Sequence, residues 1–266
     1  MVNRRYLLLL LVVAFPVTSA TLASASYDRF LLPFYFPFSV DGALGSRWIS
    51  EVTLSNGGDQ PVQVKGVGVG CPFDPCPDIP IQPGVTVPLF FRGLEINAVP
   101  GRFIDVQHDA TAFAIQLRIR DVSRENLSFG TELPVVHESR AVAGTLNVAN
   151  IPLAPNYRQL LRIYDFSQTL GAGVRIRFFD VAPSSAQTWL DQPRDVLLRE
   201  ATVPFLVRLS DQPGYAQFSD FGPLIAASLH AMLRIQMEPL NPNSRIWALV
   251  TLTNNDTQQV TIVSPK

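Results

Sequence analysis

Apolar and polar residues alternate with a period of two through much of this 266-residue chain. Such alternation is typical of strands that bury one face of a sheet, because successive side chains point to opposite sides. The clearest apolar faces are Phe113, Ile115, Leu117 and Ile119; Val174, Ile176 and Phe178; Leu233, Ile235 and Met237; and Ile246, Ala248, Val250 and Leu252. Clusters of Gly, Pro, Asn and Asp separate these runs, as turns require. The sequence therefore predicts an all-β protein of short strands.

The strand runs divide the chain into two similar halves. The expected β-hairpins join Trp48–Leu54 to Val62–Val69, Ala112–Val122 to Phe129–Val136, Leu160–Asp165 to Val174–Val181, and Ile246–Asn254 to Gln259–Val263. Between the halves, His137–Gly144 is polar, rich in small residues and without alternation. Halves of about 110 to 120 residues have the size of immunoglobulin domains. The sequence therefore predicts two tandem immunoglobulin-like antiparallel β-sandwiches, at residues 26–138 and 139–266.

Two local features depart from plain strands. The apolar face of the run Val62–Val69 changes parity near Gly66, which predicts a β-bulge at that glycine. A short helix is expected within Asp220–Met232, with Ser219 or Asp220 as its N-cap.

The first 25 residues have the features of an export signal. Arg4 and Arg5 precede the apolar run Tyr6–Val17, and Ala23-Ser24-Ala25 has the small-x-small pattern that signal peptidase cleaves. The apolar run is shorter than the ~20 residues of a membrane-spanning helix. A general secretory signal cleaved before Ser26 is the favoured interpretation, with a twin-arginine signal and a retained anchor as alternatives. We therefore expect an exported protein, periplasmic or extracellular, without a transmembrane segment in its mature chain.

Charge and cysteine content narrow the expected partners. Charged residues make up 16% of the chain and the formal net charge is −1, which does not favour binding to nucleic acid or anionic lipid. The two cysteines, Cys71 and Cys76, lie close together among prolines. In an oxidising compartment they are expected to form a disulfide that closes a short loop. A redox role and free thiols are the alternatives.

Both ends of the mature chain resemble a known group of sequences. The segments Leu32-Pro33, Gly42–Asn56, Trp247–Val250 and Thr253–Thr261 are similar to recurring segments of uncharacterised exported bacterial proteins with tandem immunoglobulin-like β-sandwich domains. The resemblance covers these terminal segments. It implies export and a β-sandwich fold, and it brings no known activity or site residues.

Motifs for nucleophilic catalysis, phosphate binding and metal binding are missing from the sequence. His108 and His137 each precede a carboxylate, but adjacent residues on an extended chain point to opposite faces, so neither pair is expected to act as an acid–base couple. Together with His230, they are interpreted as surface or hydrogen-bonded residues. Asp and Asn in the turns are attributed to turn geometry rather than to calcium binding. We expect no catalytic site, no metal and no cofactor.

Arginines recur between the apolar residues of several strands, at Arg118, Arg120, Arg162, Arg175, Arg177 and Arg234. One interpretation is a basic stripe that binds an acidic glycan. Acidic residues follow closely at Asp121, Asp165, Asp180 and Glu238. Solvated cross-strand ion pairs are therefore the favoured interpretation.

The segment Phe30–Phe38 is apolar on both faces. Its prolines confine such a segment to a sheet edge or a bulge. Phe34, Tyr35, Phe36 and Phe38 are therefore a candidate interaction edge, through which the chain would join another subunit. Packing between the sheets of its own half, or against the second half, is the favoured alternative.

These observations favour a non-catalytic exported module that binds a ligand or has a structural role at the cell surface or in the periplasm. A protein or a cell-surface glycan is the expected class of partner. A two-domain periplasmic chaperone, a carbohydrate-binding protein and an enzyme are the alternatives. The fold class alone does not name the ligand.

Overall fold

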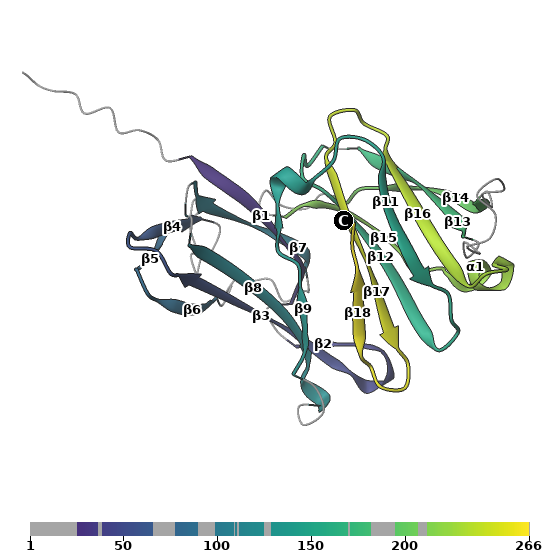
Figure 1. Ribbon diagram of the computed structural model, residues 1–266, viewed down its shortest axis with the longest axis horizontal. Helices are drawn as coiled ribbons and strands as arrows, with labels where there is room; N and C mark the ends of the chain where they lie inside the picture. The colour runs from purple at the N-terminus through teal and green to yellow at the C-terminus, as the bar shows by residue number, and fades with distance from the viewer. Residues whose placement is uncertain are drawn as a thin grey trace, which may run out of the picture.

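The chain folds almost entirely into β-strands in the computed structural model (Figure 1). The structure describes residues 26–36, 39–65, 78–89, 99–108, 110, 112–124, 129–169, 171–181, 195–206 and 212–265. This part of the chain contains 18 strands and a single α-helix, and its strands pair antiparallel. The prediction of an all-β protein is confirmed. None of the helices in the described residues is long and apolar enough to cross a membrane.

The first half of the chain forms two sheets that share one apolar core. The β1 sheet has the order β10 (Val136–His137), β1 (Tyr27–Tyr35), β7 (Val99–Gln107), β4 (Val62–Lys65) and β5 (Ile79–Ile81). The β3 sheet has the order β2 (Val40–Asp41), β3 (Arg47–Asn56), β8 (Phe113–Asp121) and β9 (Thr131–Leu133), with β6 (Thr86–Leu89) also paired to β3.

The second half has the same organisation, with two sheets around a second core. The β12 sheet has the order β15 (Gly214–Phe218), β12 (Tyr157–Asp165), β17 (Ile246–Asn254) and β18 (Val260–Val263). The β13 sheet has the order β11 (Leu146–Pro152), β16 (Met232–Pro239), β13 (Gly173–Asp180) and β14 (Val196–Pro204). Figure 1 shows the two halves side by side, with β9 and β18 between them.

The predicted strand faces are confirmed, but only two of the four predicted hairpins are. Strand β8 pairs with β9, and β17 pairs with β18, as expected. The hairpins of β3 with β4 and of β12 with β13 are wrong, because the strands of each pair lie in different sheets. Each of these two connections crosses from one sheet to the facing sheet. The similarity of the two halves in the sequence therefore reflects a connection between facing sheets early in each half and a hairpin late in each half.

The two halves meet through the β1 sheet and the β12 sheet. Tyr164, Phe166, Trp247 and Leu249 belong to the second half, yet they are buried in the core of the first. Every residue of β17 from Ile246 to Leu252 is buried, because one parity packs into the second core and the other packs against the first half. The β12 sheet is thus covered on both faces, which accounts for the continuous apolar run in β17.

The candidate interaction edge lies largely at this junction. Strand β1 is an inner strand, paired with both β10 and β7. Phe34 and Tyr35 are 5% and 2% exposed, and Phe36 is half-buried. The guanidinium carbon of Arg162 on β12 lies 3.8 Å from the ring centre of Phe34. Within this chain, Phe34 therefore contacts the second half, whereas Tyr35 lies near Arg102 of the first half; Phe38 lies outside the described residues.

The predicted helix is present but shorter than the predicted stretch. Helix α1 spans Gly222–Ala227, with Pro223 in its first turn. Its N-cap is Phe221, and no side chain caps it, so the prediction of Ser219 or Asp220 as the cap is wrong. Proline at this point begins the helix, because its fixed φ suits the first turn.

Several sequence predictions concern residues that the structure does not describe. They are the export signal at residues 1–25, the bulge at Gly66 and the disulfide between Cys71 and Cys76.

Candidate functional site

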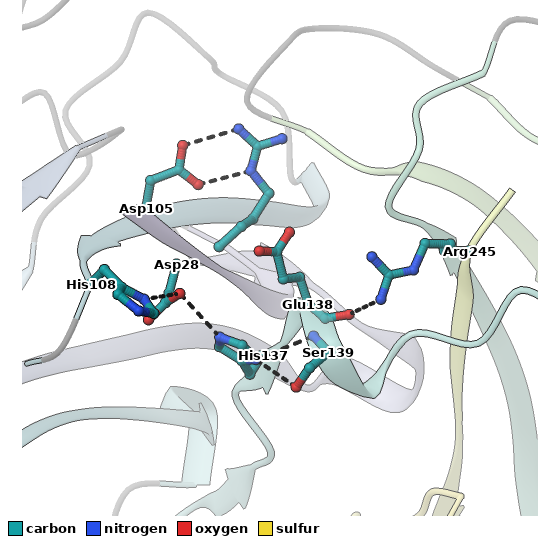
Figure 2. Close-up of polar contacts among 8 residues, drawn as sticks. Asp28, Asp105, His108, His137, Glu138, Ser139 and Arg245 are labelled. Carbon is teal, nitrogen blue, oxygen red and sulfur yellow. Dashed lines mark hydrogen bonds and ion pairs between the residues drawn. The ribbon is translucent and has the colours of Figure 1, made fainter. Parts of the chain in front are cut away.

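Two histidines lie beside one carboxylate near the junction of the halves (Figure 2). His108 Nδ1, in the turn after β7, is 2.8 Å from Asp28 Oδ1 on β1. His137 Nε2, on β10, is 3.7 Å from the same oxygen. The sequence does not indicate this cluster, because Asp28 and the two histidines are far apart along the chain. They come together only through the pairing of β1 with β7 and β10.

Ser139 adds a hydroxyl to this cluster, but its contacts are those of a turn cap. Its Oγ is 2.7 Å from His137 Nδ1, and its backbone N–H donates to the same nitrogen at 3.2 Å. His137 is the N-cap of the 3-10 turn Glu138–Arg140. In serine hydrolases the hydroxyl bonds to Nε2 and the carboxylate to Nδ1, whereas here the two nitrogens are exchanged. The arrangement holds the turn between the two halves and does not resemble an activated nucleophile.

Charged groups around this turn connect the halves further. Arg245, next to the first residue of β17, donates from Nη2 to the carbonyl of Glu138 at 3.0 Å and to that of Ala141 at 3.4 Å. Nearby, Arg29 forms a two-pronged pair with Asp105 at 2.8 and 3.0 Å, across β1 and β7. Figure 2 shows Arg245 reaching the backbone of Glu138. Arg245 is thus a polar link between the strands of the second half and this turn, whereas the pair of Arg29 with Asp105 lies within the first half.

The third histidine belongs to a buried carboxylate that ends β13. Asp180 is 2% exposed and accepts hydrogen bonds from Ser228 Oγ at 2.6 Å and from the Leu229 N–H at 3.0 Å. His230 Nδ1 lies 2.9 Å from its second oxygen. Burial alone would raise the pKa of Asp180, but the hydrogen bonds outweigh it and lower the pKa below its ordinary value. Asp180 is therefore charged and satisfied, and it fixes the turn before β16.

Buried carboxylates end two other strands in the same way. Asp121 accepts from the Arg47 N–H at 3.0 Å and from Ser123 Oγ at 2.6 Å. Asp165 accepts from the Ser167 N–H at 3.1 Å, and from Ser244 Oγ and the Arg245 N–H, in the segment before β17, at 3.2 and 3.3 Å. The interpretation of Asp165 and Asp180 as cross-strand partners of arginine side chains is thus wrong. An aspartate at a strand end accepts from backbone N–H groups that the ladder no longer pairs.

The arginines on the β13 sheet do form solvated ion pairs. Arg177 Nε lies 2.6 Å from Glu200 Oε2, and Arg175 Nη1 lies 3.1 Å from Glu238 Oε2. Arg234 likewise pairs with Asp195 at 2.6 Å. Arg162 instead packs on the ring of Phe34. Such exposed pairs neutralise the arginines and contribute little stability, about 0–1 kcal/mol each.

A cleft of about 890 Å³ lies between the halves, and we call it the junction cleft. One wall comes from β3, the end of β8 and the start of β9, and the other from the β17–β18 hairpin. Its lining consists of Trp48, Asp121, Phe129, Gly130, Thr131, Asp256, Thr257, Gln258, Gln259, Val260 and Thr261. In Figure 1 these segments meet near β2, where the β17–β18 turn approaches the first half.

Trp48 is held in place by its own hairpin. Its indole Nε1 donates to Ser46 Oγ at 2.9 Å, and Ser46 is itself 1% exposed. Gly42 passes so close that a Cβ at this position would lie 2.6 Å from Trp48 Nε1. The indole therefore has a fixed polar edge and a fixed orientation in the wall of the cleft.

Phe129 is the most exposed large apolar residue of the described chain, at 93%. It precedes Gly130, whose φ of +88° is a left-handed conformation that glycine adopts readily. A Cβ at Gly130 would lie 2.5 Å from the carbonyl oxygen of Ile119, so a larger residue would force the backbones apart. This close approach fixes the backbone next to Phe129, whose side chain lines the cleft.

The opposite wall is a turn braced by internal hydrogen bonds. Asn254 Oδ1 accepts from the Asp256 and Thr257 N–H groups at 2.8 and 3.0 Å. Gln258, which is 4% exposed, donates to the Asn255 carbonyl at 2.7 Å and accepts from Arg158 Nη2 at 2.5 Å. The side chains of Asn254 and Gln258 thus hold the backbone of the turn in place.

Three side chains of this wall remain open to a ligand. Asp256, Gln259 and Thr261 are exposed, and within the described part of the chain their side chains make no hydrogen bond. A carboxylate, an amide and a hydroxyl thus face solvent beside two aromatic rings. No local pattern in the sequence indicates these residues, because the lining of the cleft comes from segments that are far apart along the chain.

No group of His, Cys, Asp and Glu side chains among the described residues is arranged to hold a metal ion. Comparison with known protein families, with characterised proteins and with solved structures gives no match.

Proposed function

We propose that this protein is an exported, non-catalytic binding protein made of two tandem immunoglobulin-like β-sandwiches, with its ligand site in the junction cleft. Paired antiparallel sheets around an apolar core in each half support the sandwich assignment. The basic start, the apolar run Tyr6–Val17 and the Ala23-Ser24-Ala25 pattern support export.

The observation that carries the binding role is the junction cleft itself. Its volume of about 890 Å³ lies within the range of about 300–1,000 Å³ that is typical of small-molecule sites. Both walls are held by bonds within the chain, at Trp48 on one side and Asn254 on the other. A site that is rigid before binding loses less conformational entropy when the ligand enters.

The contacts of the histidines support a non-catalytic role. His137 caps a turn, and His230 satisfies the buried Asp180. His108 pairs with Asp28 on the neighbouring strand. None of these three lines the junction cleft. The polar groups of the cleft are carboxylates, amides and hydroxyls, which suit binding through hydrogen bonds.

Thermal unfolding of the mature protein tests this function. The panel contains oligosaccharides, peptides and small organic anions, and a ligand that binds only the native state raises Tm. We expect at least one class to raise the Tm of the wild type and to leave the Tm of Thr261→Arg unchanged, because a long side chain there obstructs the cleft. Thr202→Arg, at an exposed position on β14, is the matched control. An equal response of Thr261→Arg, or no response to any class, would refute the proposal.

A further inference from the structure

We infer that the ligand of the junction cleft is an uncharged oligosaccharide. This inference rests on the proposed function and names the ligand class of that same site. Three properties of the lining carry it: two aromatic rings in one cleft, the absence of cationic side chains from the described lining, and a row of open hydrogen-bonding groups.

The aromatic rings suit the apolar faces of sugar rings. Phe129 is 93% exposed, and Trp48 lines the same cleft with its N–H already bonded to Ser46. The remaining contact surface that Trp48 offers is therefore its apolar ring. The faces of aromatic rings carry negative electrostatic potential and attract the weakly positive C–H groups of a sugar. Two such rings in one cleft provide separate positions for units of a chain.

The charge of the described lining disfavours an anionic ligand. The exposed carboxylate of Asp256 is in the lining, and the lining residues that the structure describes include no Lys, Arg or His. The arginines of the β13 sheet, which the sequence analysis considered for an acidic glycan, are paired with Glu200 and Glu238. A sulfated or carboxylated sugar would thus meet the negative charge of Asp256, and the described lining offers it no cation.

Open polar groups complete the match to hydroxyl-rich ligands. Asp256 accepts hydrogen bonds, Gln259 both donates and accepts, and Thr261 does both as well. A sugar hydroxyl also donates and accepts, so each of these groups can bond to one. These side chains lie in the turn between β17 and β18 and at the start of β18, in the same cleft as Trp48 and Phe129.

A peptide fits the same wall less well. Peptides that add to a sheet need free backbone groups along an edge strand. The edge strands β9 and β18 approach each other here, and Thr131 Oγ1 donates to the Val260 carbonyl at 3.2 Å. The carbonyl that an added strand would use is thus already bonded within the chain.

Isothermal titration calorimetry of the mature protein tests the inference. The uncharged probes are oligosaccharides of glucose, galactose, mannose and N-acetylglucosamine. Oligogalacturonate is the anionic comparison and a mixture of short peptides is the third class. We expect an uncharged probe to bind and Phe129→Ala to weaken it about ten-fold, as removal of a large apolar contact does. Leu229→Ala is the matched control, because Leu229 is 86% exposed and does not line the cleft.

A charge substitution separates the ligand classes. Asp256→Lys replaces an open acceptor by a cation, so it should weaken an uncharged glycan and strengthen oligogalacturonate. Asp59→Lys, at an exposed position in the first half, is its control. Binding of peptide or oligogalacturonate that Phe129→Ala weakens, without binding of uncharged sugars, overturns the glycan inference and leaves the proposed function standing. Failure of all three classes to bind, or binding that Phe129→Ala does not change, overturns both.

Discussion

Gly101 on β7 lies against the ring of Tyr164 on β12, so closely that a Cβ on the glycine would be 2.8 Å from Tyr164 Cε1. Tyr164 is fully buried and stacks on Trp247, with ring centres 6.1 Å apart. Burial raises the pKa of Tyr164 even though Arg162 lowers it in part. Backbone of the first half thus packs directly on aromatic rings of the second.

Substitution of this glycine should loosen the junction. Gly101→Ala places a methyl group in contact with the Tyr164 ring, and overpacking of this kind costs about 1–3 kcal/mol. Urea denaturation followed by far-UV circular dichroism measures the loss. Gly144→Ala is the control, because no atom lies within 4 Å of a Cβ there. Equal stability of the two variants would show that the halves do not pack as closely as described.

Phe34 and Phe36 should be needed for the stability of the monomer. Their rings lie 6.2 Å apart, and Phe34 is 5% exposed beneath Arg162. Phe34→Ser with Phe36→Ser should lower the free energy of unfolding by several kcal/mol, since loss of one buried Phe costs about 3–5 kcal/mol. Phe129→Ser, at an exposed ring, should cost little. Unchanged stability together with lost oligomers in size-exclusion chromatography would instead support a role of this segment in joining subunits.

Asp180 should make stability depend on pH in the acid range. Hydrogen bonds hold its folded pKa below the unfolded value of about 3.9, so its contribution is present above that value and is lost as the pH falls through the folded pKa. Asp180→Asn should destabilise the protein by about 1–3 kcal/mol at pH 7, and less at pH 2. Urea denaturation at both pH values measures this, with Asp59→Asn as the exposed control. A pH-independent loss would contradict a charged Asp180.

Export should remove the first 25 residues. The exported protein should begin at Ser26, because Ala23-Ser24-Ala25 precedes it in the pattern of a signal-peptidase site. Intact mass spectrometry of the protein recovered outside the cytoplasm measures the cleavage point. A mature pool that retains Met1–Ala25 would contradict the cleaved-signal interpretation.

Cys71 and Cys76 should be joined in the exported protein, since each is the nearest available thiol to the other. Peptide mapping without reduction should recover one linked loop. Replacement of both by Ser should lower stability only slightly, because closing so short a loop removes little entropy from the unfolded chain. A loss above roughly 4 kcal/mol would show that the bond does more than shape a loop.

Alternation predicts which face of a strand is buried, but it does not identify the strand's partner. Leu117 and Ile119 on β8 are buried as expected, and β8 pairs with the predicted strand. The same kind of pattern in β3 and β4 predicts a hairpin, although the two strands lie in different sheets around one core. Both arrangements bury the same parity, so local periodicity cannot distinguish them.

The candidate site illustrates a second limit. Trp48 and Phe129 each begin a strand that the sequence predicts, but their meeting with Asp256 depends on how the halves pack against each other. That docking did have a signal: Trp247 and Leu249 make both parities of β17 apolar. An apolar residue on the expected solvent face of a strand predicts that something covers it. It does not say which surface does so.

Burial of the β12 sheet on both faces also means that the junction can form only after the second half has been synthesised. The first half leaves the ribosome first, and it carries the aromatic residues of β1. Tyr164 and Trp247, which pack against that half, come later in the chain. Until then, an apolar surface of the newborn chain is exposed to other proteins, and such surfaces favour aggregation. The yield of native protein should therefore depend on how well chaperones that bind unfolded chains protect this intermediate.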